Sequence, residues 1–484
     1  MAEARLVLVG HATQTSAKIL AVFDPPLPSG SVVHLFSSAP GYSNHSTALS
    51  VMAPPYSLAL LELTQVPPSF NGTLVQYSVE SEERVPAERK RILKLLPAGK
   101  RPLRVGLLSC NGVFRVTDLN RRYLLWRELK EQVLSGKVDL LIHAGDQIYA
   151  DSIYMRQIGS VAASSEEKLE SLTSEYRQIY FNTWSDPEIQ AVLESCPSLM
   201  MWDDHDIYDG YGSHGDDSSP LAQTIFAAAK KAFWEFQAQK NPERFSDHSF
   251  AFSTMIGDIA LLMLDGRTNR MWKEGSVLGK EQLADIEKCL ASMVKQNPAL
   301  LVIVTAVPFL HVPVMSYLKL LERMEWKGAL REDLRDSWTA CNNQTEGFNF
   351  LSAIFRFHQE SPGTRILFLC GDVHVATVGH LESTLPEFRF PDGSSMKINQ
   401  VVSSGIGSPA PYGIVRLLLE WAAKEKVSLL NGAFLGKLRK LSSPDKRFLL
   451  SRRNFAILEF GPEIEVEFFA DYKGSVVRFK ETIT

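Results

Sequence analysis

Four short segments carry the side chains that could do chemistry, and each follows an apolar run of the sequence. The run Leu140–Ile142 is typical of a buried strand, because its apolar residues are consecutive. Open α/β sheets bind ligands at the carboxyl ends of their strands, so we expect the four segments to converge on one crevice. They are Ser109-Cys110-Asn111, Gly145-Asp146 with Tyr149 and Asp151 on the same loop, Asp203-Asp204-His205-Asp206 with Asp209, and Gly371-Asp372-Val373-His374.

Such a crevice would hold a thiolate, a phenolate, several carboxylates and two histidines. Carboxylates cannot share a pocket unpaired without taking up protons, and hard cations are the natural partners of oxygen ligands. If Asp146 bridges two ions about 3.5–4 Å apart, the pair would suit in-line displacement at phosphorus. His205, next to Asp204, could donate a proton to the leaving oxygen.

Each segment alone also has a structural interpretation. Acidic pairs are common in turns and helix caps, and a cysteine at a strand end, such as Cys110, is as often a small core residue. Gly210–Gly215 matches a dinucleotide-binding glycine pattern, but it follows an acidic loop instead of a strand. The chain has neither a nucleophile elbow nor a Walker A loop, which argues against these classes of enzyme.

The bulk composition is that of an ordinary globular protein. The 484 residues suffice for two or three domains, and the net charge of −4 gives no footprint for nucleic acid or an anionic membrane. Five scattered cysteines without a CxxC pair fit a reducing compartment better than a disulfide framework. We find no apolar run long enough for a membrane span and no convincing signal peptide, so we expect a cytoplasmic protein.

The elements that position the four segments follow a change of pattern near residue 100. Five short β-rich runs separated by proline pairs predict a small all-β, Ig-like sandwich over residues 1–96. From Leu103 onward, strands alternate with helices, which predicts a layered α/β core over residues 103–484 with a helical and β-rich carboxyl-terminal extension. We expect one amphipathic helix at 118–134 and a hairpin turn at Gly257-Asp258.

The motifs resemble those of the calcineurin-like metallophosphoesterases, and among them the PhoD-type alkaline phosphatases. The resemblance covers roughly Leu103–Ser404 and rests on GDQIY, WDDHD and GDVH, with SCN in place of the usual first motif. It implies a two-sheet αββα sandwich as the fold of the α/β core. Two departures are Asp209-Gly210, where the family usually has asparagines, and the missing export signal.

The resemblance also implies a set of ligands. Fe(III) would be bound by Cys110, Asp146 and Tyr149 with either His374 or Asp372. One or more divalent cations would be bound by Asp146, Asp204, Asp209 and Asp372, with Ca²⁺ expected and Mg²⁺, Mn²⁺ or Zn²⁺ as alternatives. Arg267 lies in a segment similar to the family's LDTR and would either bind a substrate phosphate or pair with Asp265.

The expected function is metal-dependent hydrolysis of a phosphoester, with a metal-bound hydroxide as nucleophile and His205 as general acid. The substrate would be a small-molecule or lipid phosphoester, and the sequence does not choose between monoesters and diesters or indicate an oligomeric state. One alternative is a catalytically silent metal-containing module that recognises a phosphorylated partner, and a weaker one is a redox role of the iron. The segments Glu166–Thr183 and Met315–Thr339 are expected to shape substrate choice.

Overall fold

The structure is a computed structural model, and it describes residues 4–81, 90–99, 101–157, 166–213, 217–312, 335–338, 340 and 342–483. Most of Met315–Thr339 lies outside the described residues. Within these ranges, no helix combines the length and the apolar character that a membrane span requires.

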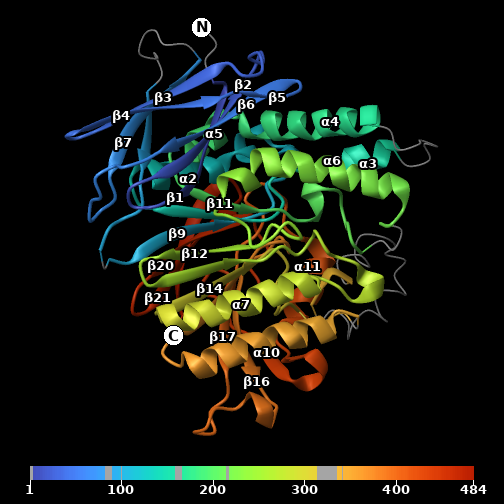
Figure 1. The fold of residues 1–484 in the computed structure, drawn as a ribbon. Coiled ribbons are helices and arrows are strands. Elements are labelled where there is room, and N and C mark those ends of the chain that lie inside the picture. Colours follow the sequence, from blue (N-terminus) through green and yellow to red (C-terminus); the bar gives the residue numbers. More distant parts are fainter. Residues whose placement is uncertain are drawn as a thin grey trace.

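The amino-terminal part of the chain forms two four-stranded antiparallel sheets, drawn in blue in Figure 1. Their facing sides share one apolar core, which includes Val7, Ile19 and Val75. The sequence predicted five strands here and missed three, among them β4, whose mostly polar side chains alternate between exposed and partly buried. The sheets run β1-β2-β6-β5 and β4-β3-β7-β8, with β1 Leu6–Ala12, β2 Ala17–Phe23, β3 Val32–Ala39, β4 Tyr42–Leu49, β5 Val51–Ala53, β6 Tyr56–Leu63, β7 Leu74–Glu80 and β8 Arg91–Lys94.

The rest of the described chain is built on a six-stranded and an eight-stranded sheet. In the first, β9, β10 and β11 are parallel, and the carboxyl-terminal strand β20 pairs antiparallel with β9. In the second, β13, β14, β15 and β17 are parallel, and β12 joins β13 through the predicted turn at Gly257-Asp258. The orders are β11-β10-β9-β20-β21-β22 and β12-β13-β14-β15-β17-β16-β19-β18, with β9 Leu103–Leu108, β10 Leu140–Ala144, β11 Ser198–Met201, β12 Phe252–Ile256, β13 Ile259–Met263, β14 Leu300–Thr305, β15 Arg365–Cys370, β16 Thr377–Ser383, β17 Lys397–Val402, β18 Val427–Leu429, β19 Phe434–Leu438, β20 Asn454–Phe460, β21 Ile464–Tyr472 and β22 Ser475–Ile483.

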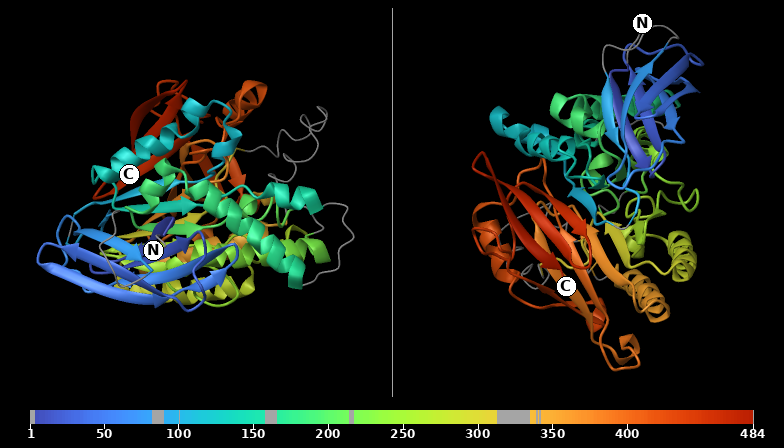
Figure 2. Two further views of the ribbon diagram at one scale, coloured as in Figure 1. Left: turned by 90° about the horizontal axis from the view of Figure 1, so that it is seen from above. Right: turned by 90° about the vertical axis from the view of Figure 1, so that its left-hand side faces the viewer.

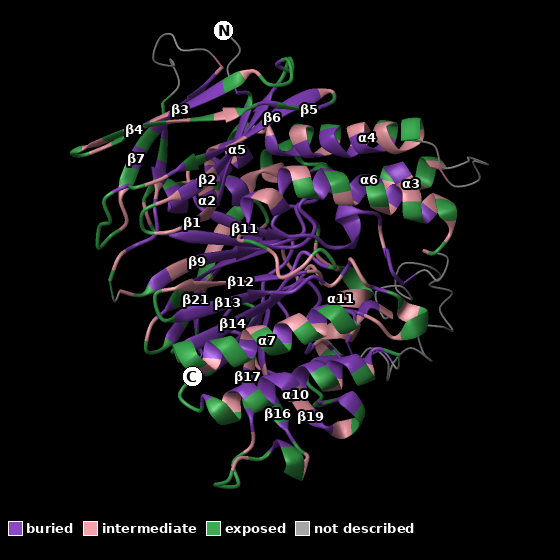
Figure 3. Ribbon diagram, viewed as in Figure 1, coloured by how far each residue is buried: buried purple, intermediate pink, exposed green. Residues whose placement is uncertain are grey.

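The two large sheets pack face to face, and helices cover their outer faces (Figures 1 and 2). Apolar side chains of both sheets form one core between them, and Figure 3 shows that the strands consist largely of buried residues. The predicted mixed α/β architecture is therefore confirmed, whereas the Ig-like topology and the domain boundaries stay predictions. The helices are α1 Leu119–Arg122, α2 Leu124–Leu134, α3 Asp151–Gln157, α4 Glu166–Trp184, α5 Pro187–Leu193, α6 Pro220–Phe236, α7 Lys280–Gln296, α10 Gln344–Glu360 and α11 Gly413–Ala422.

The prediction of a single helix at 118–134 is wrong in one respect. The helix is interrupted at Tyr123, whose φ of −102° and ψ of 14° lie outside helical values, so α1 and α2 are separate. The Asp118 side chain caps α1 by accepting a hydrogen bond from the Asn120 N–H. Only α2 carries the expected buried face, which includes Leu125, Leu129 and Val133.

A buried lysine lies where the amino-terminal sheets meet the larger core. Lys240 is 0% exposed, and its Nζ lies 2.9 Å from Met200 Sδ. Space there is tight, because a Cβ on Gly10 of β1 would come within 2.3 Å of the Lys240 carbonyl oxygen. None of the described carboxylates pairs with Lys240, and burial lowers its pKa to about 7.

We expect Lys240→Met to stabilise the protein in a pH-dependent way. The unfolded chain keeps the Lys240 proton up to a pH of about 10.4, whereas the folded chain releases it near pH 7, so the stability of the unmodified protein rises with pH between these values. The advantage of the variant should therefore be largest at pH 7 and below, and should shrink by about 1.4 kcal/mol per pH unit above pH 7. Urea unfolding at several pH values measures this difference.

Lys295→Met, at an exposed position of α7, is the matched control and should show a small, pH-independent effect. A constant difference between Lys240→Met and the unmodified protein would mean that Lys240 does not lose its proton on folding.

Candidate metal centre

The four reactive segments converge where strands of both large sheets end. Cys110 follows β9, Asp146 follows β10, Asp203 follows β11 and Asp372 follows β15. The first two loops are tied together by the backbone, since the Cys110 N–H donates to Gly145 O at 3.3 Å. The sequence prediction that these segments share one crevice agrees with this geometry.

The backbone at the centre is strained. Cys110, Asp146, Asp372 and His374 all have positive φ, between 51° and 64°, a region that non-glycine residues rarely adopt. Each such residue costs about 1–3 kcal/mol, and such strain is typical of functional sites. These strained backbone conformations direct side chains at the ends of strands from both sheets toward one place.

Gly371 allows the two sheets to approach each other at this point. A Cβ there would lie 2.4 Å from Ala144 O and 2.5 Å from Ser109 Oγ, so a larger residue would push the strand ends apart. The glycine of the GDVH motif is therefore required by packing, whatever the following residues bind.

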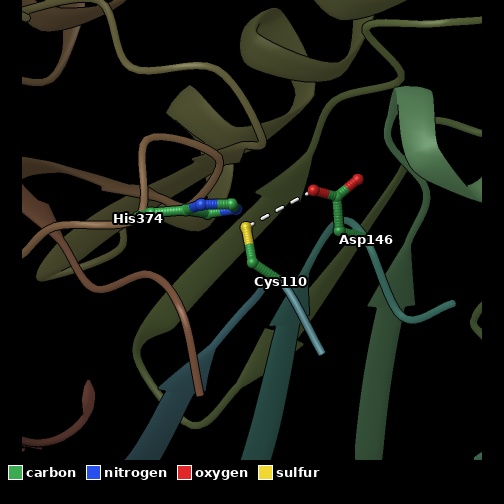
Figure 4. A group of neighbouring side chains, drawn as sticks. All are labelled: Cys110, Asp146 and His374. Carbon is green, nitrogen blue, oxygen red and sulfur yellow. Dashed lines mark hydrogen bonds between the residues drawn. The ribbon is translucent and has the colours of Figure 1, made fainter. Parts of the chain in front are cut away.

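Among the residues that the structure describes, Cys110, Asp146 and His374 form the first of three groups whose potential ligand atoms lie within 4.8 Å of one another. Figure 4 shows these three side chains pointing toward a common centre, with Cys110 Sγ 3.4 Å from Asp146 Oδ2. The Tyr149 hydroxyl lies 3.4 Å from Asp146 Oδ2 and 3.2 Å from His374 Nε2, and it accepts a hydrogen bond of 2.7 Å from Ser408. The sequence left the fourth iron ligand open between His374 and Asp372. Of these two, His374 has the side chain that lies with Cys110 and Tyr149.

The protein environment alone favours the protonated forms of the acidic members of this group. Burial raises the pKa of Cys110 well above its usual value, and the nearby Asp146 and Asp372 raise it further. Burial also raises the pKa of Tyr149, with Cys110 and Asp146 adding to the shift. A bound cation would reverse both shifts, because metal ligands coordinate in their deprotonated forms.

Asp203, Asp204 and Asp372 form another of the three groups. Burial raises the pKa of Asp203 to about 6 despite the nearby Arg267. Burial would also raise the pKa of Asp204, but His205 and Arg267 lower it to about 2. Asp203 was not among the predicted ligands, although the WDDHD motif contains it.

Two buried carboxylate oxygens in these groups, Asp146 Oδ1 and Asp203 Oδ2, accept no hydrogen bond from any described residue. An unpaired buried carboxylate oxygen is costly, and a cation would remove the cost. The available donors are a thiol, a phenol, an imidazole and several carboxylates, a set that suits a transition metal beside a harder cation. The residues present therefore fit the expected cofactors.

His205 belongs to the remaining group, with Asp146 and Asp204, and is held by a carboxylate outside it. Its Nδ1 lies 2.6 Å from Asp151 Oδ1. Burial would lower the pKa of His205, but the charges of Asp204, Asp146 and Asp151 raise it well above its usual value. Asp151 thus holds the imidazole in one orientation, and the surrounding carboxylates favour its protonated form.

Two predicted site residues, Asp209 and Arg267, lie next to these groups without belonging to them. The Asp209 side chain is 48% exposed, and its Oδ1 is 3.9 Å from His205 Nε2. Arg267 is fully buried, and its guanidinium donates to Asp203, to Asp336 Oδ2 at 2.6 Å and to the Tyr211 carbonyl at 3.0 Å. Asp265 accepts from the Arg267 backbone N–H instead, at 3.1 Å. The ligand role of Asp209 and the phosphate contact of Arg267 stay predictions.

Asp206 stabilises the loops of the centre, a role that was not predicted from the sequence. Its carboxylate accepts hydrogen bonds from the backbone N–H groups of Asp203, Gln147 and Ile148, at 2.9, 3.3 and 3.4 Å. It thereby ties the GDQIY loop to the DDHD loop. Because Asp206 lies within a run of acidic residues, the motif alone does not reveal this role.

Comparison with known proteins agrees with this geometry. Alkaline phosphatase D of Bacillus subtilis is 27% identical over 104 residues, which are 20% of this chain and 18% of that protein. Uncharacterized protein YGR266W of Saccharomyces cerevisiae is 23% identical over 356 residues, which are 57% of this chain and 50% of that protein. The chain thus spans at most half the length of these curated relatives.

A solved structure of PhoD superposes with a TM-score of 0.65 at 15% identity, over 99% of this chain and 88% of that one, which shows a common fold. The family model for the PhoD-like phosphatase matches residues 105–428, about two thirds of the chain. The matched range contains all four reactive segments. The chain therefore belongs to the PhoD-like phosphatase family.

Proposed function

We propose that the protein is a metal-dependent phosphoester hydrolase. The observation that carries this proposal is that the three potential metal-binding groups share members. Asp146 belongs to the group of Cys110 and to that of His205, and Asp204 belongs to the group of His205 and to that of Asp203. Adjacent groups with common carboxylates can hold cations side by side, the arrangement of enzymes that displace groups at phosphorus. Membership of a phosphatase family supports the same reaction class.

The proposed iron site consists of Cys110, Asp146, Tyr149 and His374, and the proposed divalent site, with Ca²⁺ expected, of Asp146, Asp204 and Asp372 with a contribution from Asp209. When bound, the cations lower the pKa of a coordinated water and neutralise negative charge on the phosphoryl oxygens. Asp203 could join the second site through its unpaired Oδ2.

The chain itself supplies the proton for the leaving group. The neighbouring carboxylates raise the pKa of His205, and its Nδ1 is held by Asp151, which leaves Nε2 for the ester oxygen. This pair also argues against the alternative of a catalytically silent module. A module that only recognised a phosphorylated partner would have no use for a histidine kept protonated beside the metal ligands.

The first test combines metal analysis with the visible absorption spectrum of the purified protein. We expect iron and a tyrosinate-to-iron absorption band that disappears in Tyr149→Phe, because the phenol oxygen lies within hydrogen-bonding distance of His374. Hydrolysis of p-nitrophenyl phosphate and of bis(p-nitrophenyl) phosphate should be measured on the same samples.

Tyr123→Phe is the matched control for the spectrum, since this tyrosine lies at the break between α1 and α2. Absence of iron and of the band would contradict the ferric assignment. A metal-loaded protein that hydrolysed neither ester would favour the silent module.

A further inference from the structure

Arg115 lies at the edge of the metal centre, and no sequence motif marks it. Its side chain is 42% exposed, and its Cζ lies 4.1 Å from the centroid of the Tyr149 ring. Its Nη2 donates to Asp151 Oδ2 at 2.8 Å. The other oxygen of the same carboxylate holds His205.

Arg115 and His205 both contact the ring of Tyr149. The imidazole centroid is 4.2 Å from the centroid of the phenol ring, and the guanidinium carbon is 4.1 Å from it. The two groups also bind the two oxygens of the same Asp151 carboxylate. The tyrosine, whose hydroxyl lies beside Asp146 and His374, therefore has a proton donor and a permanent cation against its ring.

Two other arginines described near the centre are closed to solvent. Arg267 is fully buried and donates to two carboxylates and a carbonyl. Arg270 is 3% exposed and lies against Asp336. Arg115, by contrast, is partly open to solvent, and its guanidinium donates to Asp151.

We propose that Arg115 binds a non-bridging phosphoryl oxygen of the substrate while the leaving oxygen lies next to His205, and that this contact makes phosphate monoesters the preferred substrates. The inference rests on the proposed function. It assigns to Arg115 the phosphate contact that the sequence had suggested for Arg267.

The preference for monoesters follows from what each substrate presents to Arg115. With the leaving oxygen next to His205, the phosphorus of a monoester carries three non-bridging oxygens, so an anionic oxygen can face Arg115. In a diester, the second ester substituent, which is neutral and larger, can occupy that position. A guanidinium forms strong, charge-assisted hydrogen bonds with the anionic oxygen, so it discriminates between the two.

The test compares Arg115→Met and Arg115→Lys with the unmodified protein, all loaded with the same metals. For Arg115→Met we expect kcat/KM for p-nitrophenyl phosphate to fall about 10- to 100-fold, and that for bis(p-nitrophenyl) phosphate to fall much less. Calorimetric affinity for inorganic phosphate should fall by the same factor as the monoester kcat/KM. Arg115→Lys keeps the charge without the planar guanidinium. Its kcat/KM for the monoester should therefore lie between those of the unmodified protein and of Arg115→Met.

Arg127→Met is the matched control, because Arg127 is exposed on α2 and donates only to the Asn120 carbonyl. The control should leave both esters and phosphate binding unchanged. Metal content and thermal unfolding of every variant show whether the fold is intact.

The outcomes separate this inference from the proposed function. Equal loss of both activities in Arg115→Met, or unchanged phosphate affinity, would overturn the substrate contact, since Arg115 would then act only by holding Asp151 and Tyr149. If the unmodified protein hydrolysed neither ester but bound phosphate through Arg115, the proposed hydrolysis would fail and the binding role of Arg115 would stand.

Discussion

Replacing His205 with alanine is expected to lower the turnover number for phosphoester hydrolysis by about 10²- to 10⁴-fold, the usual contribution of a general acid. The bound metal content should not change, because the proposed sites retain Cys110, Asp146 and His374 for one cation, and Asp204 and Asp372 for the other. Steady-state kinetics with p-nitrophenyl phosphate and elemental analysis of the same sample measure both quantities.

Asp151→Asn tests the carboxylate that binds Nδ1 of His205. Asp151 raises the pKa of His205, so its removal should lower that pKa and move the alkaline limb of the pH–rate profile to lower pH. Activity at low pH should change less, since His205 is protonated there in both proteins. Loss of metal from His205→Ala would make this histidine a ligand, and an unmoved alkaline limb in Asp151→Asn would mean that a group other than His205 donates the proton.

Arg267→Met is expected to cost about 3–5 kcal/mol of unfolding free energy. The arginine is buried among three carboxylates, with Asp336 Oδ2 at 2.6 Å, Asp204 Oδ1 at 3.6 Å and Asp203 at hydrogen-bonding distance. Its removal would leave these negative charges close together and unpaired. Urea unfolding of the metal-free protein measures the loss without contributions from bound cations.

Arg356→Met is the control, because its pair with Glu287 at 2.5 Å joins two exposed side chains, which are 57% and 54% exposed. It should cost less than about 1 kcal/mol. If Arg267→Met kept full stability but raised KM for phosphoesters, the structural role would be wrong and the alternative of phosphate binding would be favoured.

The candidate site was largely predictable, because its residues follow apolar strands within the sequence. Asp146, Asp204 and His374 lie in short motifs whose position at strand ends is visible without a structure. The partners of Arg267 were not predictable in the same way. The sequence suggested its neighbour Asp265, whereas the ion pairs join it to Asp203 and Asp336, which come from distant loops.

The same distinction applies to the fold. Strands with continuous apolar runs, such as β10 and β14, were predicted because burial on both faces leaves a clear pattern. Strand β4 was missed because most of its residues are polar, so it lacks the apolar run that marks a strand, although it forms a simple hairpin with β3. Arg115 was missed for a related reason, since its role depends on Tyr149 and Asp151 lying beside it.

The insertion of β20 next to β9 has a consequence for biosynthesis. Asn454, at the start of β20, accepts a hydrogen bond from Ser403 Oγ at 2.8 Å and donates one of 2.6 Å to the carbonyl of Ser404, whose hydroxyl contacts Cys110 Sγ. While the ribosome has yet to add this strand, β9 has an open edge and the loop around Cys110 lacks its support. The proposed metal centre therefore cannot be completed before β20 has been translated, and until then the open edge of β9 is available to chaperones that cover exposed strand edges.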